Sequence, residues 1–79
     1  MDPLPEIKLG TYRHYKGNEY EVIGVGRNSE TNEPVVVYRA MYDSEEFGSD
    51  AIWIRPASMF AENVFVNGKE MPRFEFLRK

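Results

Sequence analysis

The sequence contains no cysteine and a single histidine. Without cysteine there is no disulfide framework, no thiolate metal site and no thiol nucleophile. No apolar run approaches the roughly 18 residues that a membrane-spanning helix needs. Residues 1–6 also lack the positive region and apolar stretch of a secretory signal. We therefore expect a cytoplasmic protein without membrane contact.

Positive charge is scarce as well. Ten Lys and Arg residues stand against thirteen Asp and Glu residues, so the net charge is −3 at pH 7. This balance excludes a protein that wraps nucleic acid through its overall electrostatic field. It remains compatible with a local basic patch.

A chain of 79 residues is long enough for one domain at most. Domains of this size bury only about 60% of their unfolded surface. Aromatic residues make up 14% of the chain, and large rings compensate for a short chain by burying much area each. Pro3 and Pro5 fall in a stretch without apolar periodicity, so residues 1–9 are predicted to be a flexible tail before a single domain over residues 10–79.

Short strands separated by turns are predicted for most of this domain. Gly24 and Gly26 interrupt the second strand and suggest a bulge or bend, and Asn67-Gly68 is typical of a type I′ hairpin turn. Residues 43–50 are predicted to be an acidic loop, and residues 56–61 form the only plausible helical stretch. The predicted strands cover residues 11–15, 19–27, 35–42, 51–55, 63–66 and 69–77. The expected fold is all-β with one short helical turn, similar to a small SH3-like barrel of five or six strands.

Several separated segments resemble motifs of a family of bacterial proteins and occur in the same order as in that family. They are Tyr12 to Val22, Ser29-Glu30-Thr31, Val36 to Arg39 with Met41-Tyr42, Trp53 to Pro56 with Met59-Phe60 and Glu62, and Gly68 with Pro72-Arg73-Phe74. The family is domain of unknown function 1653, and the resemblance covers about residues 10–76. It implies a small stand-alone cytosolic bacterial protein and no established activity. Asn28 departs from the pattern, because a histidine often precedes Ser-Glu-Thr in the family.

His14 is the natural candidate for acid–base chemistry, as the only imidazole in the chain. Ser29 and Glu30 would complete a catalytic triad with it, but sequence spacing alone does not support one. A loop serine beside an acid more often bonds to the backbone of its own turn. A small enzyme that uses His14 with a carboxylate is therefore an alternative, and we do not expect catalysis.

The acidic loop is the only candidate for a metal site. Its four carboxylates could begin a calcium site, but their spacing does not match an EF-hand loop. We expect a solvated loop, with neither a metal nor a cofactor. The four residues are Asp43, Glu45, Glu46 and Asp50.

Aromatic and basic residues occur together at several points in the chain. Strand alternation places Trp53 and Arg55 on one face and Ile52 and Ile54 on the other. If the isoleucines fill the core, Trp53 and Arg55 project outward as a recognition surface. In the opposite arrangement, Trp53 belongs to the core and Arg55 pairs with an acid such as Glu62. The sequence leaves both arrangements open.

The favoured hypothesis is a non-enzymatic binding module that uses an aromatic-basic surface to recognise an anionic or extended protein partner. Arg55 would hold an anion, because a guanidinium binds carboxylate or phosphate through two hydrogen bonds. Trp53 and Tyr38 would stack against the partner, and Lys16 and Arg73 would supply peripheral charge. The predicted site residues are His14, Lys16, Tyr38, Trp53, Arg55 and Arg73.

Three other possibilities stay open beside that hypothesis. Single-stranded nucleic acid or a nucleotide could stack on the same surface. The chain could also be a structural appendage that acts only through homo-oligomerisation, although we expect a monomer or a weak homodimer. Open strand edges could accept an extended peptide, although Lys69 and Pro72 could equally protect the last strand.

Overall fold

The computed structural model describes residues 4–79. Its main element is a five-stranded antiparallel sheet in the order β6-β3-β2-β1-β9, accompanied by the two-stranded hairpins β4–β5 and β7–β8. The sheet strands are β1 (Gly10–His14), β2 (Glu19–Arg27), β3 (Pro34–Ala40), β6 (Ile52–Pro56) and β9 (Phe74–Arg78). The other elements are β4 (Asp43–Ser44), β5 (Gly48–Ser49), α1 (Ala57–Phe60), β7 (Asn63–Val66) and β8 (Lys69–Pro72).

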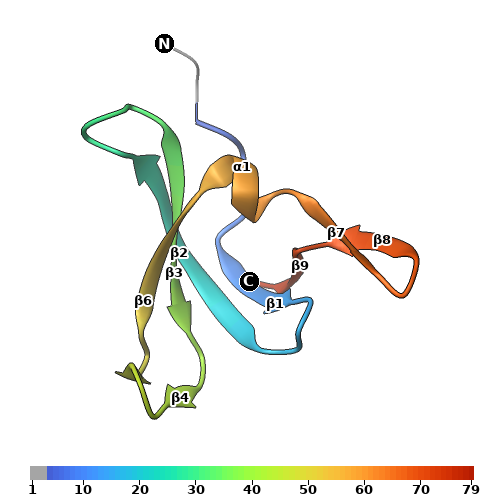
Figure 1. Ribbon diagram of the computed structural model, residues 1–79. Helices are drawn as coiled ribbons and strands as arrows, with labels where there is room; N and C mark the ends of the chain where they lie inside the picture. Colours follow the sequence, from blue (N-terminus) through green and yellow to red (C-terminus); the bar gives the residue numbers. More distant parts are fainter. Residues whose placement is uncertain (1–3) are drawn as a thin grey trace.

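The sheet curves, and the single-turn helix α1 lies at the end of β6 on the side that carries the core (Figure 1). Helix α1 begins directly after Pro56, whose fixed φ suits a helix start. Its buried residues, Ala57 and Phe60, attach it to the core cluster. The β7–β8 hairpin follows and projects from the body as an arm (Figure 1).

The core is small and rich in rings. Val22 and Val36 are fully buried at its base, with 1% and 0% of their surface exposed. Phe74 stacks on Phe60 at 4.3 Å between ring centroids, and Tyr38 meets Phe74 at 5.4 Å with its plane inclined by 64°. Such offset and edge contacts stabilise a ring cluster beyond the area it buries.

A β-bulge in β2 changes which side chains face the core. Val22 pairs with Tyr38, but Gly24 pairs with Val37, so Ile23 is the extra residue. The prediction of a bulge or bend is therefore confirmed beside Gly24, whereas the pairing with β3 continues without a shift through Gly26. Because the bulge shifts the alternation, Gly24 lies on the face opposite to Val22 and not on the same face.

Several predicted elements are confirmed. The strands over residues 19–27 and 63–66 have the expected bounds. Asn67 and Gly68 have φ values of 51° and 80°, as a type I′ turn requires. The helical turn after Pro56 is also present.

Three expectations differ from the structure. The sheet has edges at β6 and β9 and is not closed into a barrel. The last predicted strand, over residues 69–77 with a break expected at Pro72, is two separate strands, β8 and β9, which divide at Arg73 directly after Pro72. The acidic loop contains the short β4–β5 hairpin.

The predicted tail over residues 1–9 is described only from residue 4 onward. Residues 4–9 form no strand, but Ile7 packs against the core cluster and the Tyr12 hydroxyl donates to the Lys8 carbonyl at 2.8 Å. Within the described residues, no helix is long and apolar enough to cross a membrane.

Truncation of Phe74 is expected to be severely destabilising. Phe74→Ala should lower the free energy of unfolding by about 3–5 kcal/mol, because it removes a buried ring and leaves a cavity. Phe65→Ala is the matched control, since Phe65 is 75% exposed, and should change stability by no more than about 0.5 kcal/mol. Urea denaturation of both variants measures the difference. If Phe74→Ala does not fold, Phe74→Leu provides a milder comparison, and equal stability of Phe74→Leu and Phe65→Ala would contradict this view of the core.

Candidate functional site

The curvature of the sheet brings its two edges together on the core side. In a flat sheet β6 and β9 would be separated by four strand spacings, or roughly 19 Å. The Arg55 guanidinium in β6 nevertheless lies only 5.7 Å from the centre of the Phe74 ring in β9. His14, at the end of β1, contacts the same ring at 4.9 Å. A surface assembled from β1, β6 and β9 is therefore built around Phe74.

His14 lies at the centre of this surface. Its Nδ1 accepts a hydrogen bond from the Lys16 backbone N–H at 3.2 Å, so the proton of the neutral ring is on Nε2. Burial lowers the pKa of His14, and the positive charges of Arg55, Arg73 and Lys16 lower this pKa further. The imidazole is therefore held in its neutral form, as a hydrogen-bond donor among cations.

Arg55 is held by rings and by a hydroxyl group. Its Nε donates to the Tyr38 hydroxyl at 3.2 Å, and its guanidinium faces the Phe74 ring. Among residues 4–79 it has no carboxylate partner. Its charge is therefore available to a ligand, while its position is fixed by Tyr38 and Phe74.

Arg73 connects three parts of the chain. Its Nη2 donates to Glu62 Oε1 at 2.6 Å, and its backbone carbonyl accepts from the Tyr15 N–H at 2.9 Å. The guanidinium lies 6.0 Å from the centre of the Tyr15 ring. Its Nε is buried and has no hydrogen-bond partner within the described residues. One donor of Arg73 is thus unused.

Lys16 completes the group and lies in the turn between β1 and β2. Its Nζ is 5.8 Å from the centre of the Tyr15 ring, and no ion pair to it is found within residues 4–79. We call Lys16, Arg55 and Arg73, together with the His14 that they surround, the basic cluster. Two of its three cations lack a carboxylate partner in the described chain.

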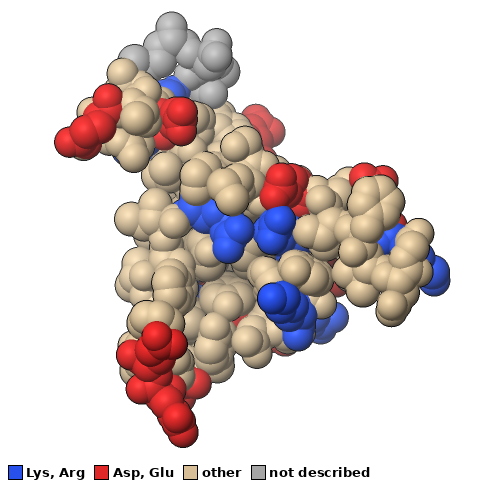
Figure 2. Space-filling view, in the orientation of Figure 1, with Lys and Arg blue, Asp and Glu red and all other residues tan. Residues whose placement is uncertain are grey.

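The charges of the molecule are separated in space. Figure 2 shows Lys and Arg side chains gathered over the middle of the core side, where the basic cluster lies. Acidic side chains are concentrated at the ends of the molecule, over the loop between β2 and β3 and over the β4–β5 hairpin (Figure 2). A chain of net charge −3 therefore presents a positive centre.

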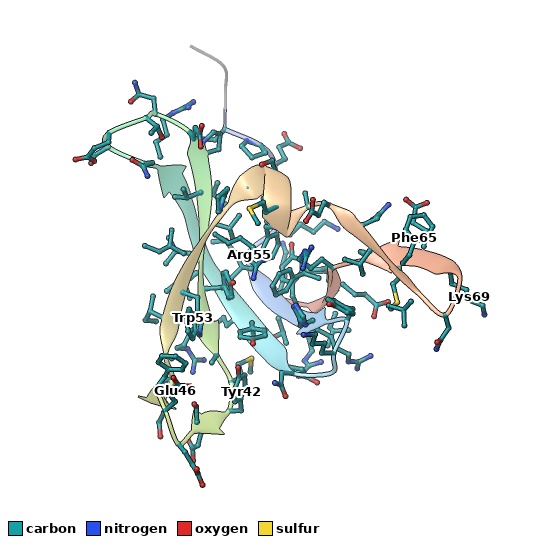
Figure 3. The ribbon with its side chains drawn as sticks, in the orientation of Figure 1. Tyr42, Glu46, Trp53, Arg55, Phe65 and Lys69 are labelled. Atoms are coloured by element: carbon teal, nitrogen blue, oxygen red, sulfur yellow. The ribbon has the colours of Figure 1, made fainter. Side chains whose placement is uncertain are left out.

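Of the two orientations of β6 that the sequence leaves open, the one with the isoleucines in the core is wrong. Ile52 and Ile54 are 54% and 67% exposed, while Trp53 and Arg55 lie half-buried on the core side. Figure 3 shows Arg55 extending from β6 toward β1 and β9. The reason is that the rings of β1, β2 and β9 already fill the core side, and an edge strand completes this side with its largest side chains. The isoleucines lie on the outer face.

Trp53 is neither exposed enough to act as a free stacking platform nor fully buried. It packs against the core cluster, and its ring meets Phe47 edge-on at 4.9 Å. The alternative pairing of Arg55 with Glu62 is also not found, because Glu62 binds Arg73. The structure thus brings His14, Lys16, Tyr38, Arg55 and Arg73 together and places Trp53 beside Tyr38 on the same side.

The sequence analysis missed the two rings that organise the cluster, Tyr15 and Phe74. Tyr15 lies near both Lys16 and Arg73. Phe74 contacts His14 and Arg55. Each ring is adjacent in sequence to a basic residue of the cluster, and this adjacency was the available signal. Whether these neighbouring residues meet in one cluster depends on the order of strands in the sheet, which short-range sequence patterns do not reveal.

Tyr20 extends the ring cluster away from the cations. Its hydroxyl is 2.7 Å from the Tyr42 hydroxyl, and its ring meets Phe74 edge-on at 5.8 Å. Burial raises the pKa of Tyr20, and the hydrogen bond with Tyr42 raises this pKa further. Tyr20 therefore stays protonated and supports the core side of the sheet structurally.

The geometry does not support the catalytic alternatives. Ser29 follows the end of β2 and His14 precedes its beginning, so the nine residues of β2, or roughly 30 Å, separate them. The Ser29 hydroxyl contacts its neighbour Glu30 instead. Among residues 4–79, no carboxylate bonds to His14, and no group of three His, Cys, Asp or Glu residues could hold a metal ion. Asp50 of the acidic segment pairs with Arg39.

Comparisons with known proteins agree with the fold. The model of the DUF1653 family, a family of proteins of unknown function, matches residues 10–76. The chain is similar to a DUF1653 protein from Bordetella bronchiseptica of known crystal structure. The identity is 33%, the TM-score is 0.82, and the match covers 91% of this chain and 88% of that one. No curated protein sequence matches. The chain belongs to the DUF1653 family.

The pKa of His14 tests the geometry of the cluster. NMR titration should give a His14 pKa below the ordinary value of 6.5, because burial and three nearby cations oppose protonation. Arg55→Gln should raise this pKa, whereas Arg13→Gln should have a smaller effect, because Arg13 lies on the opposite face of β1. A His14 pKa at or above 6.5 would contradict the arrangement.

The same shift has a consequence for stability. Because the folded pKa lies below the unfolded one, the contribution of His14 is fully present above about pH 6.5 and decreases as the pH falls from there through the folded pKa. Urea denaturation should show this loss in the natural chain and less of it in His14→Asn. An identical dependence on pH in both proteins would show that His14 is not the source.

Proposed function

We propose that this chain is a non-enzymatic binding module whose basic cluster recognises an acidic group of an extended protein or peptide partner. The observation that carries the proposal is the convergence of Lys16, Arg55 and Arg73 on His14, with Glu62 as their only carboxylate partner among residues 4–79. Cations placed close together repel each other, and the half-burial of Arg55 and Arg73 makes that repulsion stronger. A ligand carboxylate would relieve it.

The donors of the cluster match an anionic group. Arg55 is oriented by Tyr38 and Phe74 before any ligand arrives, so little side-chain entropy is lost on binding. The His14 Nε2–H is a neutral donor beside it. Charge-assisted hydrogen bonds from a fixed guanidinium are among the strongest in proteins.

Nucleic acid fits this surface less well. Stacking of bases requires exposed rings, but Tyr38 and Phe74 are 5% and 6% exposed. Acidic side chains at the ends of the molecule would also repel a phosphate backbone that continued past the cluster (Figure 2). A single carboxylate avoids both problems.

Amide chemical-shift titration of the labelled protein tests the proposal with three probes: a glutamate-containing peptide, a proline-rich peptide and an oligothymidine. The glutamate-containing peptide should shift the resonances of His14, Tyr38 and Arg55. Arg55→Gln should weaken its binding by about tenfold or more, the usual cost of one hydrogen bond to a charged group.

Arg13→Gln is the matched control, because it removes the same charge on the opposite face, where Arg13 lies 3.8 Å from Glu75. Its affinity should remain within about twofold of the natural protein. Equal losses in both variants would show that only net charge matters. Tighter, strongly salt-dependent binding of the oligothymidine would favour the nucleic-acid alternative instead.

A further inference from the structure

Strand β6 forms an open edge of the sheet. It pairs with β3 and with no other strand of the described chain. In Figure 1 no other strand of the described chain runs along its other side. The backbone N–H and C=O groups along such an edge are a template for an additional strand.

The hydrogen-bond register shows which residues present this template. The Ala40 N–H donates to the Ala51 carbonyl at 2.8 Å, so this pair is hydrogen-bonded. Because such pairs alternate along an antiparallel ladder, Trp53 and Arg55, which lie opposite Tyr38 and Val36, also bond to β3. The backbone groups of Ile52 and Ile54 therefore point to the open edge.

The outer face of this edge lacks charged side chains, which the opposite edge carries. Strand β9 carries the exposed charged side chains of Glu75 and Arg78, and charges on an edge strand discourage further pairing. Strand β6 carries the exposed apolar side chains of Ile52 and Ile54 at the corresponding place. Pro56 limits the length of any added strand but leaves these two residues free to pair.

The two faces of β6 define what an added strand would carry. Side chains opposite Trp53 and Arg55 would fall on the core side, beside the basic cluster. Charge complementarity favours a carboxylate opposite Arg55, and Trp53 favours an apolar side chain. The residue between them would lie opposite Ile54 on the outer face, where an apolar side chain would cover it.

We propose that β6 accepts an extended segment of a partner protein as a sixth, antiparallel strand. In antiparallel pairing the residue opposite Arg55 precedes the one opposite Trp53 by two positions. The segment therefore has the pattern acid–x–apolar, where x is the residue opposite Ile54 and is itself apolar. The position of the acid rests on the proposed function above. The backbone pairing rests on the register of β6.

A display library of random octapeptides, selected on the complete protein, provides the probe. Segments with the acid–x–apolar spacing should be enriched. In the complex, amide hydrogen exchange at Ile52 and Ile54 should slow at least tenfold. Exchange at Trp53 and Arg55, whose amides already bond to β3, should change little.

Two modified versions of the selected peptide separate backbone pairing from charge recognition. N-methylation at x, whose N–H would donate to the Ile54 carbonyl, should weaken binding at least tenfold. N-methylation at the acid, whose N–H would point away from β6, should have less than a twofold effect. Replacement of the acid by its amide should weaken binding about tenfold.

Each contrary outcome has a definite meaning. If binding needs the acid but ignores N-methylation at x, strand addition is wrong and the proposed function stands. If N-methylation at x matters but the acid does not, charge recognition fails and the proposed function fails with it. If the selected peptides are not enriched in the acid–x–apolar pattern, the inference is wrong. Slow exchange at Ile52 and Ile54 in the free protein, with a dimer mass by light scattering, would show that a second copy occupies the edge.

Discussion

The contacts of Phe74 are the constraint on which the rest of the structure depends. This ring stacks on Phe60 of α1 and meets Tyr38 of β3 and His14 of β1. A chain of 79 residues has little apolar area to bury, so these rings decide which face of the sheet becomes the core. Curling the sheet around Phe74 also draws its two edges toward each other.

The same contacts explain why positive charge collects in an acidic chain. Arg55 and Arg73 belong to distant parts of the sequence, and each is fixed over a ring of the core or its margin. Rings attract cations without neutralising them. The positive charge of the cluster therefore stays largely unneutralised, whereas ion pairs with carboxylates would have neutralised it. Among the three cations of the basic cluster, only Arg73 has a carboxylate partner within the described residues.

Local patterns in the sequence predicted local structure well. The strand over residues 19–27, the Asn67-Gly68 turn and the helix start at Pro56 each depend on a few adjacent residues, and all are present. The sequence did not decide the orientation of β6, because Ile-Trp-Ile-Arg is compatible with either face. That choice depends on which rings other strands supply, and hence on the order of strands in the sheet. The grouping of His14, Arg55 and Arg73 was expected from residue type, but the contact of His14 and Arg55 with the Phe74 ring was not.

The central claim is that the ring-supported cations form an anion-binding centre on the core side. The most direct test is to follow the arginine Nε–H and histidine ring NMR signals during addition of inorganic sulfate at constant ionic strength. Our account predicts that the signals of Arg55, Arg73 and His14 shift together with one midpoint, while the signal of Arg13 stays unchanged. Equal shifts at all arginines, or none at the three named residues, would contradict it.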